Sequence, residues 1–149
     1  MVMGDLLSNP AVQAWAISSI VVALKTMAAG MYTSSIRIRK SIFASNEDYA
    51  MQKVEPAAGL DDEVERSRRI HQNDLETGLP FMLVGLVYAL TGPSTAGLWI
   101  CFAGFPLARI AHTIVYARGL MPHRTIAFMV GWIITLWMAL SSLWALLIS

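Results

Sequence analysis

This sequence of 149 residues contains one cysteine and no recognisable metal-binding motif. The one cysteine, Cys101, lies in an apolar stretch, and a single thiol excludes both an internal disulfide framework and a cysteine-rich metal site. The three histidines have no metal-ligand spacing, and there is no serine-hydrolase elbow or phosphate-binding loop. We therefore expect no metal ion and no chemistry that depends on those motifs.

Charged residues are also scarce, at 14% of the chain, whereas hydrophobic residues make up 56% and the mean hydropathy is +0.54. The net charge is +1, and no basic patch with interleaved aromatic residues is present, so we expect no nucleic-acid partner. A water-soluble domain of this size would have to expose much of its apolar surface. Long apolar runs are instead typical of segments that span a lipid bilayer. They cover roughly residues 11–36, 78–90, 94–117 and 125–148.

The second apolar run, 78–90, is shorter than the ~20 residues that a membrane span requires. We therefore expect its helix to begin earlier, in the polar stretch 64–77. Pro80 and Pro106 lie within apolar runs, where a proline kinks a membrane helix without ending it. The sequence thus predicts an all-α, integral membrane four-helix bundle that forms a single domain over residues 1–149.

Basic residues gather at two of the three connections between the runs. The first connection, 37–63, is polar and should be a loop that is partly helical at most. The N-terminus, the turn at Gly92 and the C-terminal tail contain no Lys or Arg, so the positive-inside rule puts these three parts outside the cytoplasm and the two basic connections inside it. Nine of the eleven Lys and Arg residues belong to the basic connections: Arg37, Arg39, Lys40, Lys53, Arg66, Arg68, Arg69, Arg118 and Arg124.

All ten acidic residues lie at or before Glu76, so the last two apolar runs contain none. Arg109, in the middle of the third run, therefore needs a partner from another segment, and Asp74 and Glu76 are the nearest candidates. A charge within a membrane helix costs ~3 kcal/mol on insertion scales and usually marks a functional site or an interhelical pair. Two interpretations stay open, a structural pair with a carboxylate and a direct contact of Arg109 with a ligand.

A polar stripe follows the start of the second predicted helix. At about 100° per residue, Arg66, Arg69, Asn73 and Glu76 fall within about a quarter of the helix circumference. Guanidinium groups bind carboxylates, an amide binds peptide groups and a carboxylate binds an amine, and a small zwitterionic peptide has all of these groups. The alternative is a solvated helix end that carries positive-inside charge.

A second stripe lies on the third predicted helix. It consists of Arg109, His112 and Tyr116, with Thr113 beside it. Such a line of hydrogen-bonding groups is either an internal polar seam or part of a polar cavity at membrane depth.

Several short segments, in order and at matching spacing, carry a resemblance to one known family: 37–40, 43–48, 64–76, 80–81, 88–93, 108–116 and Arg124. Together they resemble the MAPEG family, the membrane-associated proteins in eicosanoid and glutathione metabolism, and especially its branch of microsomal glutathione transferases and prostaglandin E synthases. The resemblance runs from about residue 25 to residue 137. It implies a homotrimer of four-helix subunits in the bilayer, with glutathione held between neighbouring subunits near the cytoplasmic side.

The resemblance also implies roles for individual residues. Arg124 matches an arginine thought to stabilise the glutathione thiolate, and Asp48 matches an aspartate implicated in the chemistry of the synthases. A thiol has a pKa of about 8.5, so a fixed cation nearby favours its nucleophilic thiolate form. Candidate glutathione contacts are Arg37, Arg69, His71, Asn73, Glu76, His112 and Tyr116, and Arg68 joins them by resemblance to the transferases alone.

We expect a glutathione transferase that acts on a lipophilic electrophile, with reduction of lipid peroxides as a further activity and detoxification as its role. One alternative is a glutathione-dependent prostaglandin E synthase, an endoperoxide isomerase of eicosanoid metabolism, and another is a non-catalytic membrane scaffold of the same fold. Phe128 is as in the transferases, the retained Asp48 is compatible with the isomerase, and the retained Arg124 argues against a scaffold. The host membrane is the endoplasmic reticulum in a eukaryote and the inner membrane in a bacterium.

Overall fold

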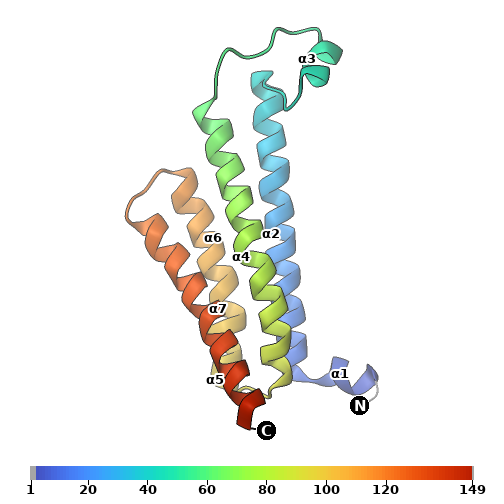
Figure 1. Cartoon of the computed structure of the whole chain (residues 1–149), viewed down its shortest axis with the longest axis vertical. Helices are drawn as coiled ribbons and strands as arrows, with labels where there is room; N and C mark the ends of the chain where they lie inside the picture. The colour runs from blue at the N-terminus through green and yellow to red at the C-terminus, as the bar shows by residue number, and fades with distance from the viewer. Residues whose placement is uncertain (1–2, 149) are drawn as a thin grey trace.

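The regular elements of the chain are all helices, as the sequence predicted. The computed structural model describes residues 3–148, and no strand occurs among them (Figure 1). Helices α5, η1 and α6 follow one another without a break and form one continuous helix, Thr95–Ala117. In chain order the elements are α1 (Met3–Ser8), α2 (Pro10–Lys40), α3 (Asn46–Gln52), α4 (Asp62–Leu90), α5 (Thr95–Leu98), the π-helical turn η1 (Trp99–Ala103), α6 (Gly104–Ala117) and α7 (His123–Ile148).

Three helices in the described part of the chain are long and apolar enough to cross a membrane: α2, the continuous helix Thr95–Ala117, and α7. Large apolar side chains such as Leu107, Trp137 and Leu147 are more than half exposed on these helices. A surface of this kind is stable against lipid tails and unfavourable in water. The chain is therefore an integral membrane protein. Helix α4 does not meet the same criteria because its first half is polar, so a fourth span stays a prediction.

Helix α4 begins well before its apolar run, which confirms the predicted extension through residues 64–77. The side chain of Asp61 caps the helix by accepting hydrogen bonds from the backbone N–H groups of Glu63 and Val64, each at 3.0 Å. Lys40 at the end of α2 also donates to Asp61, at 2.9 Å. Because these hydrogen bonds, above all that from Lys40, favour the ionised carboxylate, they lower the pKa of Asp61.

Neither Pro80 nor Pro106 ends its helix, as predicted. Pro80 lies inside α4, and Pro106 lies in α6 just after the π-helical turn η1. A proline has no backbone N–H to donate to the preceding turn, and the wider π-helical turn occurs where that ladder is interrupted.

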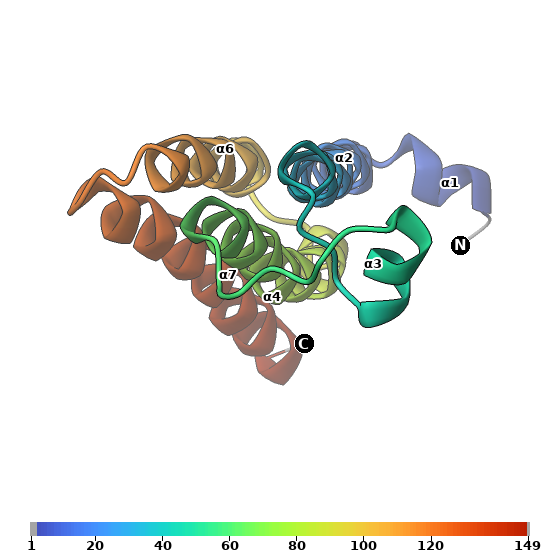
Figure 2. The ribbon, with the colours of Figure 1, turned by 90° about the horizontal axis from the view of Figure 1, so that it is seen from above.

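The long helices pack side by side, with α4 in contact with α2, α6 and α7 (Figure 2). The connection that contains α3 lies at the same end of the bundle as the connection between α6 and α7, and the two ends of the described chain lie at the opposite end (Figure 1). The predicted loop 37–63 is helical at both ends, because α2 continues to Lys40 and α4 begins at Asp62, and it contains the short helix α3. All the basic connections therefore share one end of the molecule, which we call the basic end.

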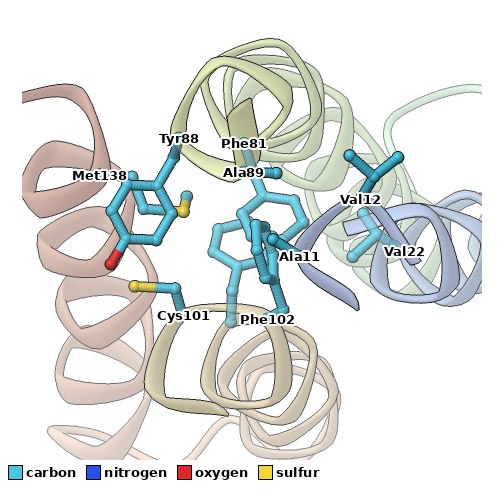
Figure 3. Packing of buried hydrophobic residues seen from close by; sticks show 10 residues of the cluster. Ala11, Val12, Val22, Phe81, Tyr88, Ala89, Cys101, Phe102 and Met138 are labelled. Carbon is cyan, nitrogen blue, oxygen red and sulfur yellow. The ribbon is translucent and has the colours of Figure 1, made fainter. Parts of the chain in front are cut away.

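Aromatic side chains fill the core between α4 and the continuous helix Thr95–Ala117. The rings of Phe81 and Phe105 are stacked with their centroids 3.8 Å apart, and Phe102 meets Phe81 edge-on at 6.2 Å. The hydroxyl of Tyr88 points toward the sulfur of Cys101 (Figure 3). Cys101 itself is fully buried. Cys101 is thus a packing residue in the half of the bundle away from the basic end.

Candidate functional site

A buried cluster of charges joins the middle parts of three helices, α2, α4 and α6. Asp74 on α4 is 2% exposed, and its Oδ1 accepts hydrogen bonds from Lys25 on α2 and, at 3.0 Å, from Nη2 of Arg109 on α6. Of the two carboxylates that the sequence offered as partners for Arg109, the structure selects Asp74. Glu76 instead is exposed and accepts a hydrogen bond from Gln72 at 2.9 Å. Lys25 was missed, although it is the one charged residue within the first apolar run, 11–36.

The polar stripe predicted on α4 faces α6 and α7. Arg66 donates to the backbone carbonyl of Ala117 at the end of α6, and Asn73 accepts a hydrogen bond from Arg109. Glu76 lines a small groove of about 260 Å³ with Thr77 on α4 and side chains of α7. Arg66, Asn73 and Glu76 therefore lie on the same side of α4, toward α6 and α7.

The residues of the second stripe meet the start of α7. His112, which is 2% exposed, lies edge-on to Tyr116 with ring centroids 5.5 Å apart, and Phe128 of α7 lies 6.2 Å from His112. The guanidinium carbon of Arg124 lies 4.5 Å from the centroid of the Tyr116 ring. This cation–π contact fixes the Arg124 side chain against α6 at the basic end. The structure thus brings together three of the predicted site residues, His112, Tyr116 and Arg124.

A second group of predicted residues lies on the other side of α4. Arg37, Arg68 and His71 line a groove of about 880 Å³ between α2 and α4. Nδ1 of His71 lies 3.1 Å from the carbonyl oxygen of Thr26, and since a carbonyl only accepts, this nitrogen carries the proton. A side chain in place of Gly30 would put a carbon 3.1 Å from the His71 ring, so the glycine allows His71 to lie close against α2.

The predicted glutathione contacts therefore occupy two opposite faces of one chain. Residues two apart on a helix point about 200° apart, which explains why His71 faces α2 when Asn73 faces α6. Arg69 is exposed and falls on the Asn73 side by its position along α4. Asp48 stands apart from both faces, in the first turn of α3, and its carboxylate makes no hydrogen bond or ion pair within residues 3–148.

Several buried polar atoms near these faces have no hydrogen-bond partner among the residues that the structure describes. They include Nε of Arg37, Oδ2 of Asp74, Nε and Nη1 of Arg109, Nδ1 of His112 and Oγ1 of Thr113. Most buried polar groups in proteins are paired, so such atoms indicate sites that a ligand, ordered water or a second chain completes. Nε of Arg37 is a donor in a guanidinium group, which suits a ligand that carries carboxylates.

Sequence comparisons identify the family of this chain. A model of the MAPEG family matches residues 15–144. The chain is 40% identical to microsomal glutathione S-transferase 1 of Rattus norvegicus over 140 residues, which cover 91% of this chain and 90% of that protein. It is 34% identical to prostaglandin E synthase of Homo sapiens over 139 residues, which cover 93% of this chain and 91% of that protein. Since the family model and both relatives match nearly the whole chain, this protein belongs to the MAPEG family.

Proposed function

We propose that this protein is a membrane-bound glutathione transferase, with reduction of lipid hydroperoxides as a further activity. The observation that carries the proposal is a set of arginines near the helix ends that adjoin the basic connections, together with the exposed carboxylate of Glu76. They are Arg37 in the last turn of α2, Arg68 and Arg69 near the start of α4, and Arg124 at the start of α7. Glutathione has two carboxylates and one ammonium group, so an excess of guanidinium groups with a carboxylate matches its charges. The relatives named as glutathione S-transferases support the same conclusion.

The division of the candidate contacts between two faces supports a site that is shared between subunits. One copy would contribute Asn73, Glu76, His112 and Tyr116, and its neighbour would contribute Arg37 from the opposite face. In a closed ring of three copies every chain uses both faces, so each site is complete. We therefore propose a homotrimer with glutathione bound between neighbouring chains.

Arg124 is the residue that we assign to the chemistry. When bound, glutathione supplies a thiol whose thiolate form attacks the electrophile. The guanidinium of Arg124, held against the ring of Tyr116, is a fixed positive charge that favours that thiolate and stabilises negative charge that develops on a leaving group. The remaining contacts bind and orient, with guanidinium groups for the carboxylates and Glu76 for the ammonium group. An apolar electrophile would reach the site from the lipid through the exposed apolar faces of the helices.

A binding measurement combined with a conjugation assay tests the proposal. Purified protein in detergent should bind glutathione and conjugate it to 1-chloro-2,4-dinitrobenzene, at a stoichiometry and mass that fit a trimer. Binding without conjugation would support the glutathione site but contradict the proposed transferase activity. The absence of binding would support the scaffold alternative.

Prostaglandin E synthase activity is the second candidate. It is favoured by the relatives of that name and by the position of Asp48 in the first turn of α3, where its carboxylate has no partner among the described residues. Conversion of a prostaglandin endoperoxide that requires glutathione and is lost in Asp48→Asn would support it. Transferase activity that is unchanged in Asp48→Asn would assign the two reactions to different residues.

A further inference from the structure

Arg109 makes two hydrogen bonds with one nitrogen. Its Nη2 donates to Oδ1 of Asp74 and to Oδ1 of Asn73, which are adjacent in α4. An Nη2 atom carries two hydrogens, so both contacts can exist at once. Arg109 is thus the link between the buried charge cluster and a residue of the stripe that faces the candidate site.

This contact determines which way the amide of Asn73 points. A guanidinium group only donates hydrogen bonds, so the atom of Asn73 that faces Arg109 must be the carbonyl oxygen. The amide nitrogen then points away from Arg109, and it makes no hydrogen bond with any residue that the structure describes. Asn73 is half-buried, so this nitrogen is open to a ligand.

We propose that Arg109 is a positioning residue that fixes Asn73 as a hydrogen-bond donor toward an acceptor oxygen of glutathione, either a carboxylate or a peptide carbonyl. The inference rests on the proposed function. Arg109 is then neither only a structural partner of a carboxylate nor a direct contact of the ligand. It acts on the ligand through Asn73 and does not itself touch the ligand. Asp74 then holds Arg109 in place through its Oδ1. Glu76, three residues after Asn73 in α4, provides the acceptor that Asn73 does not.

A double-mutant cycle on glutathione binding tests the inference. Arg109→Met should weaken binding about three- to tenfold, which is the usual effect of losing the preorganisation of one polar side chain. Asn73→Ala should weaken binding by about tenfold or more, because it removes the hydrogen bond itself. In the Asn73→Ala background, Arg109→Met should have no further effect, because the residue through which it acts is gone. Losses that multiply in the double variant would overturn the inference.

Two further variants separate positioning from charge and from folding. Lys25→Met removes a cation from the same cluster without touching Asn73, so it should lower the unfolding temperature and leave glutathione binding unchanged. An equal loss of binding in Lys25→Met would assign the effect to charge and overturn the positioning role. Asn73→Asp keeps the contact with Arg109 but replaces the donor by an acceptor, so it should fold normally and lose glutathione binding by about tenfold or more.

The controls also cover two other outcomes. If Arg109→Met does not form the wild-type oligomer, Arg109→Lys is used in the cycle, since it keeps the charge beside Asp74 and loses the planar group that reaches both acceptors. The same non-additivity with Asn73→Ala is expected, and multiplying losses again contradict the inference. Wild-type protein that does not bind glutathione refutes the proposed function together with the inference, whereas wild-type binding with an unchanged Arg109→Met refutes the inference alone.

Discussion

Replacing the carboxylate of Asp74 by an amide should destabilise the helix bundle strongly. The side chain is 2% exposed, and it pairs with Lys25 and Arg109. Asp74→Asn keeps the shape and an acceptor oxygen but leaves two buried cations without a counter-charge. Breaking a buried ion pair from one side costs about 3–5 kcal/mol, and the retained amide oxygen puts the expected loss near the lower end of that range.

A loss of about 3 kcal/mol corresponds to a fall of roughly 6–12 °C in the unfolding temperature for a domain of this size. Circular dichroism of the purified protein in detergent measures it. The double variant Asp74→Asn/Lys25→Met should be more stable than Asp74→Asn alone, because only one buried cation remains unpaired. If Asp74→Asn unfolds at the wild-type temperature, the cluster does not hold the three helices together and our reading of Asp74 is wrong.

Three further predictions follow from other parts of the structure. Glu76→Gln should weaken glutathione binding about tenfold in a calorimetric titration, because the amide no longer pairs with the ammonium group, and an unchanged affinity would remove Glu76 from the site. The pKa of Asp61 is lowered in the folded state, so the ionised carboxylate stabilises the fold fully above the ordinary pKa of 3.8, and this stabilisation is lost as the pH falls through the lower folded pKa. Asp61→Asn should remove this part of the acid dependence of unfolding. An acid unfolding profile equal to that of the wild type would contradict the role of Asp61. A cysteine placed at Ser94 should be labelled in sealed vesicles from the side opposite the connection that contains Lys53, and labelling from the same side would refute the predicted topology.

The extent of the helices could be predicted from the sequence because each depends on local signals. Long apolar runs gave three of the long helices, and the shortness of the run 78–90 required α4 to begin in the polar stretch before it. The prolines in α4 and α6 were correctly expected not to end their helices, because they lie in otherwise continuous apolar segments. The short helix α3 depends on a local cap at Ser45, a signal that we did not use.

The site was harder to predict because it depends on how the helices pack. The lack of acids after Glu76 required a partner for Arg109 from an earlier segment, and Asp74 and Glu76 were the nearest candidates by topology, but only the packing of α6 against α4 selects Asp74. The separation of His71 from Asn73 follows from the helical period and could have been derived from the sequence. The hydrogen bond between Arg109 and Asn73 could not, because it depends on the side-chain conformations of two helices.

The most direct test of the account is the pKa of the glutathione thiol when it is bound to the protein, followed by the ultraviolet absorbance of the thiolate as the pH is varied. With wild-type protein this pKa should lie clearly below the ordinary value of about 8.5, because Arg124 favours the thiolate. With Arg124→Ala it should return toward that value, and turnover should fall about a hundredfold, which corresponds to a lost charge contact of roughly 3 kcal/mol. Binding of glutathione and the size of the oligomer should change little. An equal thiol pKa in wild-type protein and Arg124→Ala, with both proteins folded and both binding glutathione, would contradict the role assigned to Arg124.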